Sequence, residues 1–363
     1  MTEHATHEAP ERPGPPLISA RPRLRIDDRS RPALNEAALE AHVHLPLSGM
    51  ASAELRLLNW THETDGPGAR FAFGDLALGQ RLTILLGEAA ERPAFEGEIT
   101  ALEERYGDGA PQLVLLAEDR LHRLARQRHS RVFAAMSLDE VLRQVAREGG
   151  LEAEVQVSEA NGDWHQLNES DLAFVLRLLR PYDIAVRLED GRLRARREEA
   201  DPRPDALSVA DNIRRLRLIA DLNHQPTTTR VGGYDLARDA AASASADRLQ
   251  PPPTGTGAGQ WLQSLGWAGE EVLPQPFARS STQAEAWARA GLRQRAKQLV
   301  HGEILCEGLP HMHAGREVTL NGVSPRLLGS YQVVDCHHHF TPNGGFTTRL
   351  YVHRPDWPKG GSA

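Results

Sequence analysis

The sequence predicts a mainly β protein in which a small α/β insert separates two β-domains. Its 363 residues, at about 150 residues per domain, favour two to three domains over a single core. The first and last thirds consist of short runs in which apolar and polar residues alternate, whereas apolar residues between Ser137 and Arg197 first recur with a helical period. Hydrophobic residues make up 40% and charged residues 25%, as in ordinary globular proteins, so the chain should fold.

Charge and cysteine content exclude several classes of protein. The 42 basic and 49 acidic residues give a net charge of -7, which does not favour specific nucleic-acid binding through phosphates. The two cysteines, Cys306 and Cys336, are too few for a disulfide framework and suit synthesis in a reducing cytoplasm. The start of the chain has no apolar leader-like segment, and no run of eighteen apolar residues occurs, so we expect neither secretion by a signal peptide nor a membrane span.

The N-terminal part of the chain predicts a tail followed by a β-domain. Residues 1–16 are rich in Pro, Glu and His, which favours disorder. Residues 17–135 contain alternating runs bounded by Gly, Pro or Asp, for example 53–57, 95–100 and 112–117. We therefore expect an antiparallel sandwich or barrel.

Residues 136–200 predict the α/β insert. Ser137 and Glu140 have the spacing of a capping box, and the apolar residues that follow form one helical face up to Val145. A second helix is expected after Asn168, whose side chain would cap it, and Pro181 would end it. A hairpin follows over residues 184–197.

Residues 201–355 predict a second β-domain with two interruptions, followed by a tail over 356–363. Residues 240–259 are rich in Ala, Ser, Pro and Gly and predict a flexible loop. A helix is expected over 282–299, opened by a capping box from Thr282 to Glu285. No sequence repeat relates the two β-domains, which leaves open whether their shapes are equivalent.

The cysteines and histidines near the C-terminus are the strongest candidates for metal chemistry. In a strand, Val334, Cys336, His338 and Phe340 would share one face, and Asp335, His337 and His339 the other, so adjacent histidines cannot chelate together. His337 and His339 could meet an opposing His311 or His313 across a hairpin. We favour the alternative of exposed imidazoles on one face and packed ones on the other, and therefore expect no metal, cofactor or catalytic residue.

Two stretches resemble phage late control protein D and the VgrG proteins of type VI secretion. The first is the helix-opening run at residues 167–179, which contains Glu-Ser-Asp-Leu-Ala-Phe, and the second is the closing region from Gly308 to Leu350. The matching positions are Asn168, Glu169, Ser170, Asp171, Leu172, Phe174, Gly308, Pro310, Gly315, Tyr331, His338, Gly345, Thr347 and Thr348. The resemblance covers most of the chain and assigns these residues structural roles.

The resemblance implies a structural baseplate hub in a phage tail or phage-tail-like particle, made in the cytoplasm. It implies two barrels of tail-tube type per chain and a homotrimeric ring that adapts a six-fold tube to a three-fold spike. The implied partners are a tail tube or tube-initiator protein, a separate spike protein and other baseplate subunits. Whether the particle is a phage, a tailocin or an injection system stays open. The alternatives are a metal-dependent hydrolase that uses the histidine-rich terminal strands, and a lectin-like β-protein.

Overall fold

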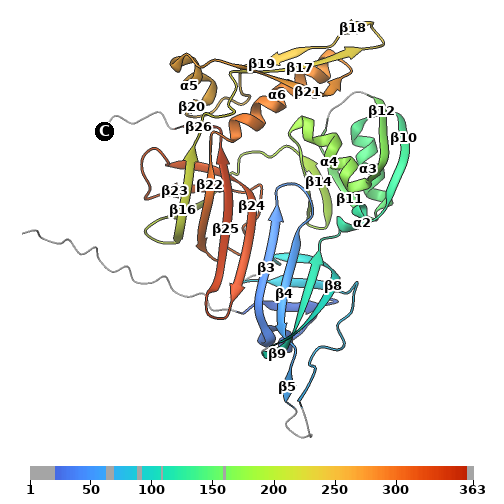
Figure 1. Cartoon of the computed structure of the whole chain (residues 1–363), viewed down its shortest axis with the longest axis vertical. Helices are drawn as coiled ribbons and strands as arrows, with labels where there is room; N and C mark the ends of the chain where they lie inside the picture. The colour runs from blue at the N-terminus through green and yellow to red at the C-terminus, as the bar shows by residue number, and fades with distance from the viewer. Residues whose placement is uncertain (1–20, 63–68, 88–91, 108, 158–160, 358–363) are drawn as a thin grey trace, which may run out of the picture.

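The computed structural model describes residues 21–62, 69–87, 92–107, 109–157 and 161–357, and its largest element is one 13-stranded sheet. The predicted N-terminal tail and most of the predicted C-terminal tail lie outside these residues. The order of the sheet is β16-β22-β25-β24-β3-β4-β9-β8-β7-β1-β2, with β15 and β23 joined beside β24. The sheet therefore runs through both predicted β-domains without a break (Figure 1).

The N-terminal β-domain surrounds an apolar cluster that includes Leu55, Ile84 and Leu115. Burial alternates along residues 52–58, as the sequence predicts, whereas residues 82–85 and 113–115 are buried without alternation. Its elements are β1 (Arg23–Ile26), β2 (Arg29–Ser30), α1 (Pro32–Ala37), β3 (Ala38–Pro46), β4 (Ser52–Leu58), β5 (Thr61–His62), β6 (Ala69–Arg70), β7 (Arg81–Leu85), β8 (Phe95–Gly107) and β9 (Gly109–Glu118).

The C-terminal β-domain has a separate core that includes Ile304, Tyr331 and Leu350. Its elements are β15 (Asp205–Ser208), β16 (Ile213–Ala220), β20 (Thr256–Gly257), α5 (Ala258–Leu265), β22 (Val300–Glu307), β23 (Glu317–Asn321), β24 (Gly329–Thr341), β25 (Gly345–Arg354) and β26 (Asp356–Trp357).

The two β-domains have the same topology. Their four long strands pair in the orders β3-β4-β9-β8 and β16-β22-β25-β24, so in both the chain order is first, second, fourth, third. Register irregularities also fall at corresponding places: Ala38/Glu40 and Ile213/Arg215 on the first strand, and Ile99/Ala101 and Val333/Asp335 on the third. The outer strands differ, because β1 is antiparallel to β7 whereas β15 is parallel to β23. The four long strands of each domain are thus equivalent in topology, although the sequence shows no repeat.

The α/β insert shares one core with a segment from the second half of the chain. Val141 and Phe174 of the insert belong to the same buried cluster as Val231 and Trp287. The insert begins before the predicted boundary at residue 136, because β10 pairs with β12 and Phe133 lies in the shared core. It contains α2 (His122–Ala125), β10 (Arg128–Met136), α3 (Leu138–Glu148), β11 (Glu152–Val155), β12 (Gly162–Ser170), α4 (Asp171–Leu179), the 3-10 turn Arg180–Tyr182, β13 (Ala185–Glu189) and β14 (Arg192–Arg196). The later segment contains β17 (Thr228–Asp235), β18 (Ala240–Ala241), β19 (Ala244–Ala246), β21 (Glu270–Ala278) and α6 (Ser281–Lys297).

Helix starts confirm one sequence prediction and correct two. Ser137 and Glu140 form the expected capping box of α3. Asn168, expected as the cap of the next helix, lies within β12, and Ser170 caps α4 by accepting the amide of Ala173. The helix expected over 282–299 is α6, and its cap is Ser280 instead of Thr282. Both errors arise because neighbouring polar residues can all cap a helix, and only the backbone dihedral angles select one.

The expected flexible loop over 240–259 is also corrected, because it contains strands and the start of a helix. β19 pairs with β17, β20 pairs with β26, and α5 begins at Ala258. Pairing with distant strands supplies order that local composition does not reveal. In the described part of the chain, no helix is both long and apolar enough to cross a membrane.

Candidate functional site at the junction of the two β-domains

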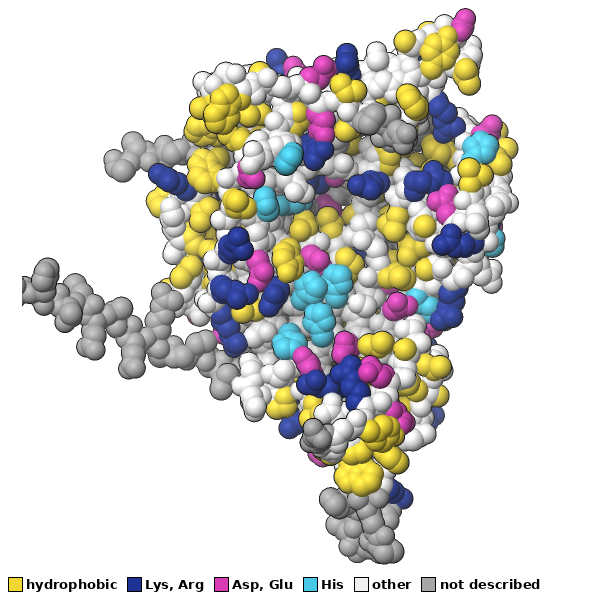
Figure 2. Space-filling view, viewed as in Figure 1, with side chains coloured by type: hydrophobic (Ala, Val, Ile, Leu, Met, Phe, Trp, Pro, Cys, Tyr) yellow, Lys and Arg dark blue, Asp and Glu magenta, His cyan; other side chains and the backbone are white. Residues whose placement is uncertain are grey.

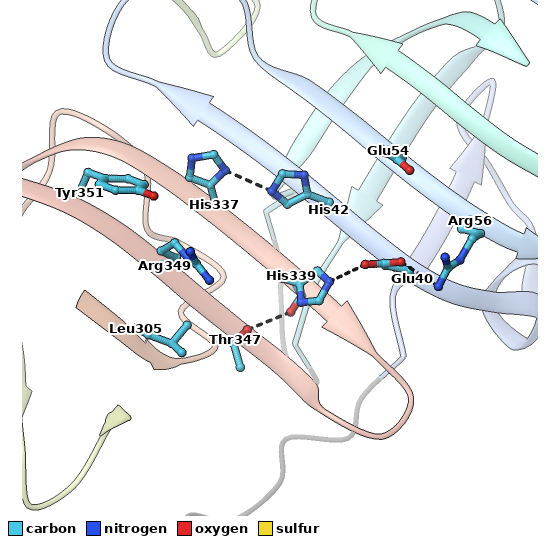
Figure 3. A pocket seen from close by; sticks show the side chains of 10 residues that line it. All are labelled: Glu40, His42, Glu54, Arg56, Leu305, His337, His339, Thr347, Arg349 and Tyr351. Atoms are coloured by element: carbon cyan, nitrogen blue, oxygen red, sulfur yellow. Dashed lines mark hydrogen bonds and ion pairs between the residues drawn. The ribbon is translucent and has the colours of Figure 1, made fainter. Parts of the chain in front are cut away.

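The two β-domains meet where β24 pairs with β3, and six titratable side chains lie on the outer face of this pairing. We call them the junction cluster: Glu40, His42, His44, Asp335, His337 and His339. His337 lies directly opposite His44, and His339 lies directly opposite His42. Figure 2 shows the histidines as a patch in the middle of this face, and Figure 3 shows the depression of about 380 Å³ that part of the cluster lines.

The junction cluster is held by contacts that cross from one domain to the other. His44 Nε2 lies 2.6 Å from Asp335 Oδ1, and His42 Nε2 lies 3.1 Å from His337 Nδ1. His339 Nε2 is 2.8 Å from Glu40 Oε1, and Arg56 contacts the other oxygen of that carboxylate (Figure 3). The rings of His44 and His337 stack with centroids 4.3 Å apart. Each β-domain therefore contributes half of the cluster.

The electrostatics of the cluster keep its carboxylates ionised and disfavour a charged His42. The hydrogen bond from His339 lowers the pKa of Glu40, against the opposing effect of burial. Burial acts to raise the pKa of Asp335, but the His337 hydrogen bond and the nearby His44 outweigh it and lower that pKa. Burial, followed by the neighbouring His337, lowers the pKa of His42. Ionised carboxylates beside imidazoles are groups that can bind a divalent cation.

The structure confirms the opposite orientations of neighbouring histidines and corrects their partners. His338 is fully buried, whereas His337 and His339 lie on the outer face. The partners of the outer pair are His42 and His44 of β3, and not His311 or His313. His311 contacts Asp205, and His313 contacts the carbonyl oxygen of Ala314.

Val334 was expected to share the buried face with Cys336, but the bulge between Val333 and Asp335 shifts the alternation, so Val333 is the buried valine. A bulge adds one residue to one strand, and alternation in a single sequence cannot reveal it.

On the buried face, two of the family-motif residues form a hydrogen-bonded chain. His338 Nε2 lies 2.9 Å from the carbonyl oxygen of Met312, which can only accept, so Nε2 carries the proton. Nδ1 then accepts from the Thr348 hydroxyl at 3.1 Å, and Thr348 Oγ1 accepts the Leu309 amide at 2.9 Å. Burial lowers the pKa of His338 to about 4, so the imidazole is neutral at pH 7. These hydrogen bonds hold the segment after β22 against the sheet.

The other motif residues of the closing region shape the same part of the fold. A Cβ on Gly308 would lie 2.1 Å from Phe346 Cδ1, so a glycine is needed there. Pro310 packs near Gly87 of the N-terminal β-domain. Tyr331 is buried and donates to the Leu327 carbonyl oxygen. The rest lie as follows: Gly315 and Gly345 have φ of +93° and +67°, and Thr347 Oγ1 contacts the His339 carbonyl oxygen.

The motif residues of the insert lie apart from the junction cluster, around the start of α4. Asp171 is buried and contacts Arg131 and Gln166 at 2.9 and 2.8 Å. Leu172 and Phe174 belong to the core of the α/β layer, and Glu169 pairs with Arg177. Asn168 adopts φ of +50°, and its carbonyl oxygen accepts from Arg128. The motif residues thus form two structural groups and no single site.

The sequence analysis missed Glu40, His42 and His44. Their spacing of two residues places all three on one face of a strand, and this was the signal available. Only the pairing of β3 with β24, from opposite ends of the chain, identifies their partners.

The family comparison identifies the class of protein. The phage tail baseplate hub (GPD) family matches residues 47–344, so the chain belongs to this family. Its role is therefore structural, at the hub of a baseplate, and its place is in a phage tail or phage-tail-like particle. Membership of this family gives no support to the hydrolase alternative.

Solved structures share the fold of this chain. A 43 kDa tail protein of prophage MuSo2 from Shewanella oneidensis has a TM-score of 0.71 at 12% identity, over 93% of this chain and 98% of that one. A tail protein from Neisseria meningitidis MC58 has a TM-score of 0.64 at 12% identity, over 92% and 96%. The E. coli c3393 protein, a component of the type VI secretion system, has a TM-score of 0.59 at 12% identity, over 91% and 76%. No curated protein matches the chain.

Proposed function

We propose that three copies of this chain close into a ring that joins a tail tube on one side to a separate spike protein on the other, with no catalytic step. The observation that carries the proposal is the shared topology of the two β-domains, down to the position of the bulges. Three chains would supply six equivalent domains, which suits a six-fold tube, while the chain itself repeats three times, which suits a three-fold spike.

The junction inside each chain offers a template for the junction between chains. In the described residues, β16, the first of the four long strands of the C-terminal domain, pairs only with β22. Likewise, the part of β8 beyond Ile99 pairs only with β9. These edges correspond to β3 and β24, which pair with each other inside the chain. Unpaired edges favour pairing with another chain. We infer that β8 of one copy pairs with β16 of the next.

The internal register specifies the contacts of this pairing. Transferring it places residues 101–106 opposite residues 216–221 of the next copy, with Glu103 opposite Ile219 and close to Arg217. Tyr106 then takes the position of Phe340, which packs in the core of the adjoining domain. Tyr106 is 62% exposed in the single chain, and such a large exposed ring suits burial at an interface.

Disulfide cross-linking tests the ring and its register together. We expect Glu103→Cys combined with Ile219→Cys to link assembled particles into covalent species of up to three chains and no larger. The native Cys306 and Cys336 are buried and should not interfere. Glu103→Cys combined with Arg230→Cys, which lies on β17, is the control and should stay unlinked. Ladders that stop at two chains, or pass three, would contradict the ring.

The partners are tested by native mass spectrometry of the chain expressed with its tube and spike candidates. We expect three hub chains with three spike chains, and a tube-side partner with six-fold symmetry. A particle image in which this subunit lies away from the central axis would contradict the adaptor role.

A further inference from the structure

The junction cluster contains three groups arranged as ligands for one metal ion. The ligand atoms of His44, Asp335 and His337 all lie within 4.8 Å of one another. His44 Nε2 and His337 Nε2 lie 2.6 and 3.6 Å from Asp335 Oδ1, so both nitrogens lie close to the same carboxylate oxygen. All three side chains are partly exposed, which leaves an ion a path from solvent.

Two imidazoles and one carboxylate are a ligand set that suits Zn²⁺ and neighbouring first-row transition metals better than Ca²⁺ or Mg²⁺, which favour oxygen ligands. Three protein ligands leave one position of a tetrahedral ion for water.

A fourth residue orients one of the ligands. His42 Nε2 lies 3.1 Å from His337 Nδ1, which directs the opposite nitrogen of His337 towards Asp335. Histidines that bind metals in proteins almost always have such a partner on the second nitrogen. His42 therefore belongs to the site as a positioning residue.

We propose that His44, Asp335 and His337 bind one divalent transition-metal ion, with Zn²⁺ as its physiological type, and that this ion cross-links the two β-domains of one chain. The rings of His44 and His337 are nearly parallel, with an interplanar angle of 7°. Two stacked rings cannot both direct a nitrogen at one ion, so one ring would have to turn when the ion binds. His44 has room to turn because its side chain is 32% exposed. The proposal departs from our expectation from the sequence that the chain binds no metal.

The position of the site gives it a structural effect. His44 belongs to β3 and the other two ligands to β24, strands that are almost three hundred residues apart in the sequence. An ion that binds only the paired strands stabilises the folded junction, because the unfolded chain does not bring the ligands together. The proposal does not depend on ring closure, since all ligands lie in one chain.

Titration of the untagged full chain, stripped of metal with a chelator, tests the site. We expect calorimetry with ZnCl₂ to show one ion per chain, and Co²⁺ to give the visible absorption of a tetrahedral site. His44→Ala and His337→Ala should each weaken binding by more than about 100-fold, and His42→Gln by about 10-fold, as is typical for the loss of an outer hydrogen-bond partner. Zn²⁺ should raise the unfolding temperature of the wild type but not of His44→Ala.

His339→Ala is the matched control, because it removes an imidazole on the same face that pairs with Glu40 and lies outside the three ligands. It should bind Zn²⁺ like the wild type. Circular dichroism of each metal-free variant checks folding. The absence of stoichiometric Zn²⁺ binding, equal binding by wild type and His44→Ala, or an equal loss in His339→Ala would overturn the proposal.

Discussion

The two β-domains solve the problem of an exposed sheet edge in different ways. In the N-terminal domain, β3, the first of the four long strands, pairs along its outer edge with β24 of the same chain. In the C-terminal domain, the corresponding strand, β16, has β22 as its only partner among the described residues. Because the four long strands pair in the same order in both domains, this difference shows that folding closes one edge and leaves the corresponding edge open in the single chain.

The N-terminal β-domain also takes part of its core from the other end of the chain. Phe340 and Phe346 of the β24–β25 hairpin belong to the same buried cluster as Leu55 and Ile84. The N-terminal domain therefore depends on residues that follow it by more than two hundred positions, and we expect the two domains to unfold together.

The largest effect should come from Phe340→Ala, which removes this shared packing. Phe340 is 1% exposed, and truncating a buried phenylalanine costs about 3–5 kcal/mol of unfolding free energy. Denaturant unfolding followed by fluorescence measures the loss. Thr347→Ala, on the outer face of the same hairpin, is the control and should change stability by less than about 1 kcal/mol. Equal losses in the two variants would show that the hairpin does not pack in the N-terminal core.

Gly308→Ala should have the next largest effect. Gly308 follows β22 as Asn59 follows β4, and it lies against the aromatic ring of Phe346. Overpacking at such a contact costs about 1–3 kcal/mol. Gly232→Ala is the control, because an added Cβ there meets no atom within 4 Å. A melting temperature for Gly308→Ala as high as that of the control would mean that the ring can move aside.

The third prediction concerns pH and His353, which occupies the position that Glu118 has in the N-terminal domain. Burial, with a smaller effect of Lys297 and His301, lowers the pKa of His353 to about 3. Below pH 6.5 the His353 imidazole therefore binds a proton in the unfolded chain but stays neutral in the folded chain. The free energy of unfolding consequently falls as the pH drops from 6.5 towards 3. Between pH 7 and pH 5 this one group should cost about 2 kcal/mol.

Denaturant unfolding of His353→Gln at the two pH values measures that contribution. The variant keeps a side chain that can hydrogen-bond Gln332, and its loss of stability on acidification should be about 2 kcal/mol smaller than that of the wild type. His301→Gln, which replaces a partly exposed neighbour with only a small effect on the pKa of His353, is the control. An unchanged pH dependence in His353→Gln would place the acid sensitivity in other groups.

The sequence was sufficient for the elements that local physics determines. Alternation predicted strands such as β4, β8 and β9, and the Ser137 capping box predicted the start of α3. The resemblance at residues 167–179 and at the closing region predicted the family. The sequence was insufficient where contacts with distant residues determine the structure. The strands within 240–259 form because they pair with β17 and β26, and Val333 is buried because of a bulge in β24.

The candidate site shows the same limit. The orientation of His337 follows from alternation, but its neighbours His42 and His44 follow from a pairing between the two ends of the chain. The equivalence of the β-domains was equally invisible, because corresponding positions carry unrelated residues, such as His337 and Glu103 or His44 and Ile219. Topology and bulges repeat here, whereas side-chain identity does not.

Tyr106→Ala should have the smallest effect on the chain and a large one on assembly. Tyr106 corresponds to Phe340, yet its ring is exposed and contacts the carboxylate of Glu104. Removing this exposed ring should change the free energy of unfolding very little, so the unfolding midpoint should equal that of the wild type. In the proposed trimer, the phenol ring of Tyr106 would fill the core of the next copy. Its loss should therefore reduce the trimer population at a fixed concentration by about 10-fold or more, as for a buried aromatic anchor. Analytical ultracentrifugation of the hub with its partners measures that population, and Tyr106→Phe, which keeps the ring, should assemble like the wild type. If Tyr106→Ala assembled normally, or lost as much stability as Phe340→Ala, then β8 would not be the open counterpart of β24.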